Sequence, residues 1–157
     1  MTESDWPVAD FDAVRSLRVL AAASPGASLV ETVIEASIES VWAVAADIEQ
    51  ELPRWLFPDI RSVQLTPTAE PERLVALAKG YSGLRARFDV VLRPGWCLMQ
   101  SRFLSGGMAA TSEGRATRFA LLGGFKGPLR VLNPIGRTIA AHALNRFAQR
   151  VHERGPR

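Results

Sequence analysis

Alternation of apolar and polar residues marks the middle of the chain. Every second residue from Leu84 to Leu92 is apolar, and Arg85, Arg87 and Asp89 occupy three of the four positions between them. Successive side chains of a strand point to opposite faces, so this pattern predicts a strand with one buried and one solvated face. Similar segments separated by Gly or Pro predict an antiparallel meander, with strands at 61–67, 73–79, 83–93, 96–104, 108–113 and 116–123.

Two helices are predicted in the first third of the chain. Residues 5–23 place apolar side chains three and four apart, with Asp5 as a candidate cap, and a Ser-Pro-Gly run ends this helix. A strand at 28–36 follows. Ser37 is then the candidate N-cap of a helix that extends to Leu52, just before a proline. The next six residues contain two prolines and two aromatic residues, which predicts a tight turn or a one-turn helix.

A long amphipathic helix is predicted at the C-terminal end. Asn133 is its candidate N-cap, Pro134 fits its first turn, and the helix extends to about residue 153. Its apolar stripe consists of Ile135, Ile139, Ala143, Phe147 and Val151. A helix of roughly 30 Å with a wide apolar face needs an apolar partner. We therefore expect it to lie across the concave side of the sheet.

Several stretches of the chain match the pattern of one protein superfamily. They are Ala36-Ser37-Ile38-Glu39-Ser40-Val41-Trp42, then Asp47, Leu52-Pro53-Arg54-Trp55 and Ile60-Arg61-Ser62-Val63. Together with the order strand, helix, aromatic turn, six strands and long helix, they resemble the START-like superfamily. This group is also called SRPBCC, or the polyketide cyclase/dehydrase and lipid-transport group. The family has Pro where this chain has Ile38.

The resemblance implies an α+β helix-grip fold, in which a curved antiparallel sheet wraps around the long C-terminal helix. It covers about residues 28–153. We expect residues 28–157 to form this domain and residues 1–27 to form an N-terminal arm or short helix. Relatives use the cavity between sheet and helix to carry lipids, sterols, hormones or quinones, or to cyclise or dehydrate polyketides. The fold alone does not choose among these activities.

Composition narrows the class of protein. The chain has 157 residues, of which 47% are hydrophobic and 22% charged, so it fits one domain with a buried core. It contains no apolar run near the ~20 residues that span a bilayer. Its first ten residues carry acids and no base, unlike a secretory signal, and its single cysteine, Cys97, cannot form an internal disulfide. We expect a cytoplasmic protein.

Charge is distributed unevenly along the chain. Residues 1–72 contain 13 acids and 4 bases, whereas residues 73–157 contain 3 acids and 15 bases. Either the two halves neutralise each other in the fold, or the second half presents a basic face to an anionic membrane or partner. A nucleic-acid partner is not expected, because the aromatic residues lie in apolar strands without interleaved bases. The sequence leaves the oligomeric state open, a homodimer included.

The candidate ligand-binding residues come from the predicted strands, the aromatic turn and the last helix. The apolar set is Trp55, Phe57, Phe88, Met99, Phe103 and Phe119, with Ser101 and Thr117 as polar points and His142 from the helix. For the strand at 96–104, the favoured register places Cys97, Met99, Ser101 and Phe103 inside. The other register places Trp96, Leu98, Gln100 and Arg102 inside, and it would bury a guanidinium.

Reactive chemistry has few candidates. His142 is the only candidate catalytic residue, as an acid or base near neutral pH. His142 and His152 are ten residues apart and Cys97 is alone, so neither a metal site nor a cofactor is expected. The chain has no Gly-x-Ser-x-Gly motif, and Cys97 lies in an apolar strand, which predicts a buried, inert thiol.

Three functions fit these observations. The first is binding or carriage of a hydrophobic small molecule, such as a lipid, polyketide or quinone-like compound, in a cavity between the sheet and the last helix. The second is a polyketide cyclase, aromatase or dehydratase that acts in the same cavity, with His142 or a pocket Arg transferring protons. The third is an interaction module that uses the basic second half on an anionic membrane or partner.

Overall fold

Seven antiparallel strands form one curved sheet in the order β1-β7-β6-β5-β4-β3-β2. The computed structural model describes residues 12–155. The strands are β1 (Ser28–Ile34), β2 (Ile60–Pro67), β3 (Arg73–Gly80), β4 (Arg85–Arg93), β5 (Trp96–Gln100), β6 (Leu104–Glu113) and β7 (Ala116–Phe125). The helices are α1 (Ala13–Ala22), α2 (Ile38–Ala46), α3 (Ile48–Trp55), the 3₁₀ helix η1 (Gly127–Leu132) and α4 (Asn133–Arg154).

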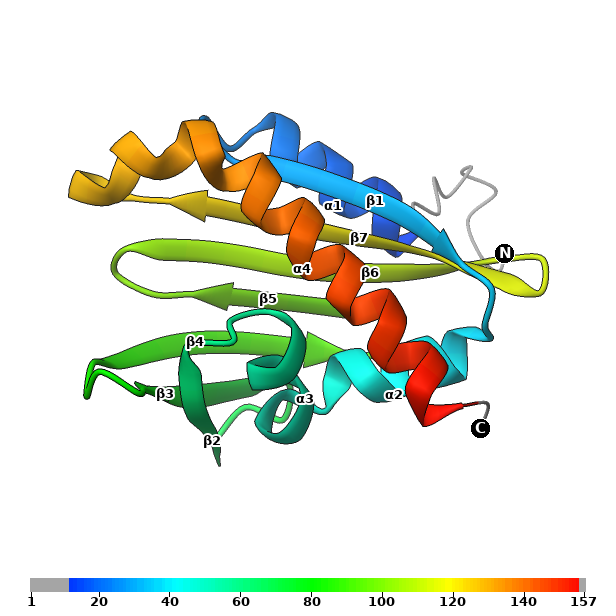
Figure 1. Cartoon of the computed structure of the whole chain (residues 1–157), viewed down its shortest axis with the longest axis horizontal. Coiled ribbons are helices and arrows are strands. Elements are labelled where there is room, and N and C mark those ends of the chain that lie inside the picture. The colour runs from blue at the N-terminus through cyan, green and yellow to red at the C-terminus, as the bar shows by residue number, and fades with distance from the viewer. Residues whose placement is uncertain (1–11, 156–157) are drawn as a thin grey trace, which may run out of the picture.

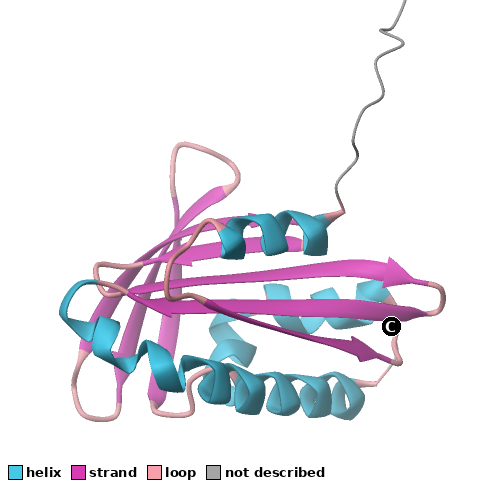
Figure 2. Ribbon diagram, turned by 90° about the horizontal axis from the view of Figure 1, so that it is seen from above, coloured by secondary structure: helices cyan, strands magenta, loops and turns pink. Residues whose placement is uncertain are grey.

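The long helix α4 lies diagonally across the concave face of the sheet, and α2 and α3 pack beside its C-terminal half (Figure 1). The short helix α1 lies on the opposite face of the sheet (Figure 2). The arrangement is the predicted α+β architecture, a sheet wrapped around a C-terminal helix. The main core fills the space between the sheet and α2, α3 and α4.

The centre of the core is an aromatic cluster of Trp55, Phe119 and Phe147, each fully buried. Phe119 and Phe147 stack with ring centroids 4.0 Å apart, and Trp55 meets Phe147 edge-on at 4.7 Å. These rings come from α3, β7 and α4. They therefore join the three elements at one point through offset and edge-to-face contacts.

The helix predicted from Ser37 to Leu52 is two helices. Ser37 caps α2 as expected, because its hydroxyl accepts a hydrogen bond from the Ser40 N–H at 3.2 Å. The chain leaves the helical conformation at Asp47, where ψ is 66°, and α3 begins at Ile48. Pro53 does not end α3, since the Leu56 N–H still bonds to the Leu52 carbonyl at 2.9 Å.

Helix α1 is shorter than its predicted range. It begins after Asp12, whose carboxylate accepts a hydrogen bond from the Arg15 N–H at 2.8 Å, and the candidate cap Asp5 lies outside the described residues. Val14 and Leu17 are buried on the outer face of the sheet. The outer face of the sheet, which the sequence predicts to be solvated, is therefore covered where α1 packs on it. The same face is solvated on β4, where Arg85, Arg87 and Asp89 are exposed.

The junction of β5 and β6 differs from its prediction. The strand expected over 96–104 ends at Gln100, and β6 begins at Leu104. The Ser101 hydroxyl accepts a hydrogen bond from the Leu104 N–H at 3.0 Å, which stabilises a turn at this point. Gly106 and Gly107, interpreted from the sequence as a turn, lie inside β6 instead.

Helix α4 has about the predicted length, but the expected cap and two of the five expected stripe residues are different. Asn133 does not cap the helix; its side-chain amide bonds to the backbone N–H and C=O of Phe125. The buried face consists of Ala140, Ala143, Leu144, Phe147 and Val151. Ile135 is 52% exposed and Ile139 is 40% exposed, so the first part of the predicted stripe is not buried.

Candidate functional site

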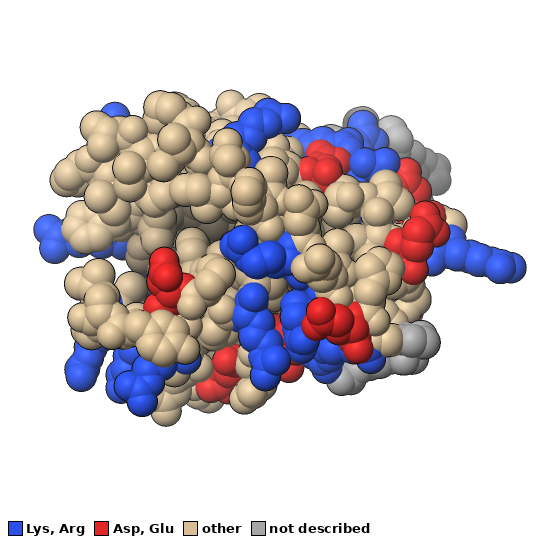
Figure 3. Space-filling view, in the orientation of Figure 1, with Lys and Arg blue, Asp and Glu red and all other residues tan. Residues whose placement is uncertain are grey.

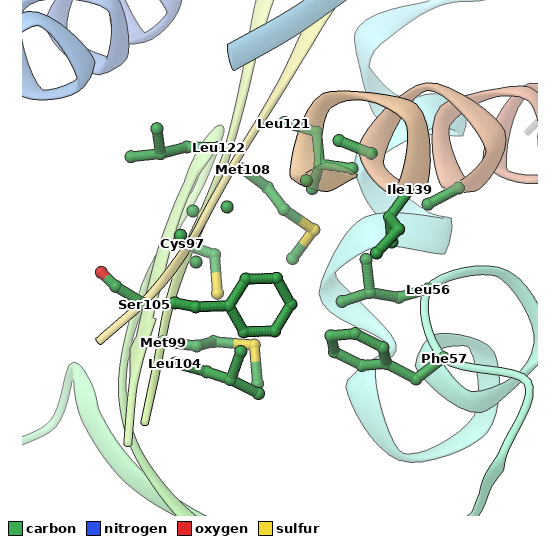
Figure 4. A pocket seen from close by; sticks show the side chains of 18 of the residues that line it. Leu56, Phe57, Cys97, Met99, Leu104, Ser105, Met108, Leu121, Leu122 and Ile139 are labelled. Atoms are coloured by element: carbon green, nitrogen blue, oxygen red, sulfur yellow. The ribbon is translucent and has the colours of Figure 1, made fainter. Parts of the chain in front are cut away.

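An apolar pocket of about 90 Å³ lies between the first half of α4, the segment that joins α3 to β2, and the sheet. A hollow is visible at this place in the space-filling view (Figure 3). The pocket is lined by Leu56, Phe57, Phe88, Cys97, Met99, Leu104, Ser105, Gly106, Gly107, Met108, Leu121, Leu122, Gly123, Gly124, Phe125, Gly136, Ile139, Ala140 and Ala143. Leu56, Phe57 and Ile139 face the sheet residues across the pocket (Figure 4).

Two glycines on neighbouring strands keep the pocket open. Gly106 of β6 and Gly123 of β7 are directly paired. Each lies two residues from a core side chain of the concave face, Met108 on β6 and Leu121 on β7, so each faces the same side. A Cβ atom added at Gly123 would meet no atom within 4 Å. The empty space exists because this paired position has no side chains.

The lining is apolar and rich in sulfur. Cys97, Met99 and Met108 present three sulfur atoms, which are polarizable and adapt to irregular apolar shapes (Figure 4). Ser105 is the single residue of the lining with a hydroxyl group, and Figure 4 shows that hydroxyl pointing away from the pocket. Shape and dispersion therefore govern what the pocket accepts, and no side-chain polar group fixes the orientation of a ligand.

Cys97 is the single titratable side chain of the lining. It is fully buried, and burial raises the pKa of its thiol to about 12. The group is therefore a neutral thiol at physiological pH, and it supplies neither a nucleophile nor an acid or base there. This agrees with the buried, inert thiol that the sequence predicts.

The reactivity of the Cys97 thiol tests whether water and reagents enter the pocket. We expect it to react with Ellman's reagent at pH 7 at least about 100-fold more slowly in the native protein than in urea, because only an exposed thiolate attacks. The measurement is the release of the thiolate chromophore, with the urea-unfolded chain as the full-reaction control. Complete native labelling at the rate of the unfolded chain would show that water and reagent enter the pocket freely.

No protein-family model matches the chain, and no curated protein matches it in sequence. Solved structures match it well in fold. The protein TTHA0849 of Thermus thermophilus is 18% identical with a TM-score of 0.61, and the match covers 82% of this chain and 99% of that one. A START superfamily protein of Mycobacterium smegmatis is 17% identical with a TM-score of 0.54, over 82% of this chain and 95% of that one.

A third neighbour is the di-domain ARO/CYC protein StfQ from the steffimycin biosynthetic pathway. It is 10% identical with a TM-score of 0.63, and the match covers 82% of this chain and 51% of StfQ. The fold is the START-like helix-grip fold. At these identities the likeness concerns the architecture alone, and the resemblance noted in the sequence is confirmed at that level.

Three of the nine predicted ligand-binding residues line the apolar pocket: Phe57, Phe88 and Met99. Trp55 and Phe119 lie outside the lining, in the buried aromatic cluster. The Trp55 indole N–H is buried and finds no hydrogen-bond acceptor within residues 12–155. Both residues therefore support the fold by packing and do not form the pocket wall.

The structure places the predicted polar points away from the pocket. The Thr117 hydroxyl is fully buried and donates to the Ala36 carbonyl at 2.8 Å, which ties β7 to the end of β1. Ser101 bonds within its own turn, and Phe103 is 41% exposed in that turn. Because β5 ends at Gln100, the alternation that correctly places Cys97 and Met99 inside does not continue to these two residues.

His142 does not reach the pocket. It is exposed, and the pocket-facing side of α4 consists of Gly136, Ile139, Ala140 and Ala143. A helix turns about 100° per residue, so His142 lies beyond Ile139 at the exposed edge of that side and about a quarter-turn from Ala143. The candidate acid or base is therefore not at the site.

The residues that sequence reasoning missed include Leu56, Leu104, Met108 and the glycine pair. The pair had a signal in the sequence: Gly-Gly occurs at 106–107 and again at 123–124. The strand pattern predicts a turn at the Gly-Gly pair 106–107, and it predicts that a strand ends at the pair 123–124. Two glycines at matching positions of paired strands mark a place where side chains are missing from the concave face.

Other site types find no support in the described chain. Within residues 12–155, no three His, Cys, Asp or Glu side chains gather in a way that could hold a metal ion. Over the same residues, no helix is long and apolar enough to cross a membrane.

Proposed function

We propose that this protein binds a small apolar molecule in the pocket between α4 and the sheet. The observation that carries the proposal is the void facing Gly106 and Gly123, which has an apolar lining and borders the main core. Cavities lower stability, so an open one in a well-packed domain calls for a reason. The likeness in fold to a START superfamily protein gives further support.

The size of the pocket limits its occupant. Pockets for drug-sized ligands measure roughly 300–1,000 Å³, several times more than the space of about 90 Å³. A molecule about the size of a single ring fits best without movement. A larger lipid-like or polycyclic ligand needs Leu56, Phe57 and Ile139 to move. None of these three side chains is fully buried.

The lining favours binding over catalysis. A cyclase or dehydratase needs a group that transfers protons near neutral pH. Cys97 is neutral in this range and His142 lies outside the pocket. The likeness to StfQ concerns the fold, and no residue of the lining adds a specific argument for polyketide chemistry.

Filling the pocket should abolish binding. The Gly123→Val variant places a β-branched side chain, which suits a strand, into the open space, and we expect it to raise the free energy of unfolding by about 1 kcal/mol. For the wild-type protein, benzene at 100 times its Kd should add about 2.7 kcal/mol. Gly123→Val should lose most of this gain. Thermal unfolding with and without benzene measures both effects.

Ser112→Val is the control, since it places the same valine side chain on β6 at an exposed position away from the pocket. It should respond to benzene like the wild-type protein. The proposal fails if benzene has no effect on the wild-type protein, or if Gly123→Val responds as strongly. Native mass spectrometry of freshly purified protein then tests for a co-purified apolar ligand.

A further inference from the structure

Five connecting segments meet at one end of the sheet. Strands β3, β5 and β7 run in the same direction, so the turns after them lie at the same end, and β1 and β2 begin there. The Tyr81 N–H bonds to the Asp59 carbonyl, and the Lys126 N–H bonds to the Phe103 carbonyl, which joins neighbouring segments. Helix α4 also begins at this end, on the left in Figure 1. We call it the mouth end, because the pocket opens beside it.

Large apolar side chains are exposed at the mouth end. Within residues 12–155, nine such side chains are exposed, and six of them lie here: Tyr81, Leu84, Phe103, Val131, Ile135 and Ile139. Tyr81, Leu84 and Val131 are the most exposed, at 75%, 76% and 79%. Figure 3 shows this end as a mainly uncharged surface with basic side chains around it. Exposed apolar residues gathered in this way mark an interaction surface.

The charges around these apolar residues are almost all positive. Residues 56–61, 79–85, 101–104 and 125–139 contain the bases Arg61, Lys79, Arg85, Arg102, Lys126, Arg130 and Arg137, and one acid, Asp59. None of these seven bases forms an ion pair within residues 12–155. Elsewhere, arginines of the second half pair with acids, as in Arg118 with Glu113 and Arg150 with Glu51.

We propose that the mouth end docks on an anionic phospholipid bilayer, with Leu84, Val131 and Ile135 in the interface and the bases against the headgroups. An apolar group rimmed by unpaired Lys and Arg matches the acyl boundary and anionic surface of such a bilayer. A second copy of this chain fits poorly, since it would bring seven further bases against the first seven. Docking places the pocket mouth against the apolar phase.

This inference goes beyond pocket binding and can fail separately from it. It concerns the surface around the mouth, so it predicts that the pocket-filling variant Gly123→Val still binds vesicles. If the pocket function is right, docking gives an apolar ligand a route between bilayer and pocket that avoids water. If vesicles do not bind while benzene does, docking is wrong and the pocket function stands.

Vesicle co-sedimentation of the full chain tests the proposal. We expect binding to vesicles of phosphatidylcholine with one third phosphatidylserine, weak or no binding to pure phosphatidylcholine, and loss of binding at high salt. The double variant Leu84→Asp/Val131→Asp should bind at least about tenfold more weakly. Arg130→Gln should weaken binding about fivefold, since each basic residue near an anionic surface contributes by about that factor.

The controls carry the same changes elsewhere. Val19→Asp/Val33→Asp makes the same change of charge and polarity on α1 and near the end of β1, at exposed positions away from the mouth end, and should bind within about twofold of the wild-type protein. Arg115→Gln, in the turn at the opposite end of the sheet, is the control for Arg130→Gln. Equal losses in control and mouth-end variants overturn the proposal.

Two further results would overturn it. Equal binding to both kinds of vesicle, or to neither, would show that the bases do not recognise an anionic surface. A dimer in sedimentation velocity that Leu84→Asp/Val131→Asp dissociates would show that this end binds a second copy of the chain.

Discussion

Replacing Phe147 by Ala should lower the free energy of unfolding by about 4 kcal/mol, as large-to-small changes of buried aromatic residues do. Phe147 is fully buried and stacks on Phe119 at 4.0 Å, and Trp55 packs against its edge at 4.7 Å. The variant leaves a void where α3, β7 and α4 meet. Urea titration measures the loss, and the melting temperature should fall by roughly 10 °C.

Phe103→Ala is the control for this substitution. The same side chain is removed at a position that is 41% exposed and outside the core, so the loss should be about 1 kcal/mol or less. Ala143 lies one helical turn before Phe147 and lines the pocket, so the new void adjoins the existing one. Benzene should therefore recover part of the stability of Phe147→Ala. Equal losses for the two variants would show that the aromatic cluster does not hold the fold together.

Much of the fold follows from local patterns. Alternation in β4 and the Ser37 cap of α2 act over a few residues, and the sequence alone could predict them. The break at Asp47 could not be predicted in this way, because it depends on how Ile48, Leu52 and Trp55 reach the core together. The pairing of β1 with β7 joins segments almost ninety residues apart, and no local pattern predicts it.

The rotation of α4 explains the largest error at the site. The sequence favours the bulky Ile135 and Ile139 as buried positions, yet the helix turns Gly136, Ala140 and Ala143 toward the sheet. Small residues permit the close approach: a Cβ at Gly136 would lie 3.4 Å from the Ser28 hydroxyl. This rotation of α4 moves His142 away from the pocket and leaves Ile135 and Ile139 partly exposed at the mouth end. Rotation of a helix is a tertiary property that periodicity alone does not determine.

The first interpretation of the uneven charge, neutralisation between the two halves, holds in part of the molecule. Arginines of the second half pair with acids of the first half in Arg118–Glu31, Arg150–Glu51 and Arg154–Asp47. These pairs join β7 to β1, and α4 to α2 and α3. Among residues 73–155, six of the nine bases that form no ion pair lie at the mouth end, and the other three are Arg87, Arg115 and Arg146. Composition could predict the imbalance but not this division, since it depends on which ends of the strands meet.

Replacing Glu51 by Ala should lower the free energy of unfolding by about 2 kcal/mol, because it removes the buried carboxylate that accepts charge-assisted hydrogen bonds from the partly buried Arg150 guanidinium. Glu51 is 5% exposed and accepts two hydrogen bonds from the Arg150 guanidinium, both at 2.8 Å. Arg154 lies 3.5 Å away and also contacts Asp47. The network joins α3 to α4 at the end of the helix opposite the pocket. Urea titration measures the loss, and a double-mutant cycle with Arg150→Ala should give a coupling above about 1 kcal/mol.

Glu70→Ala is the matched control, because Glu70 pairs with Arg73 at 2.6 Å while both side chains are largely exposed. Its loss should be within about 0.5 kcal/mol, as for other exposed ion pairs. If Glu51→Ala costs no more than Glu70→Ala, the buried network does not stabilise the contact between α3 and α4.

The same network predicts how stability depends on pH. Hydrogen bonds from Arg150 hold the pKa of the Glu51 carboxyl below its usual 4.5, and the charges of Arg150, Arg154 and Arg54 lower it further against the effect of burial. A carboxyl group whose pKa is lower in the folded state stabilises the fold above its unfolded pKa. That stabilisation is lost as the pH falls through the folded value. The melting temperature should therefore fall below about pH 4.5, and less steeply in Glu51→Gln, whose amide does not titrate. Parallel slopes for the two proteins would assign the acid sensitivity to other carboxylates.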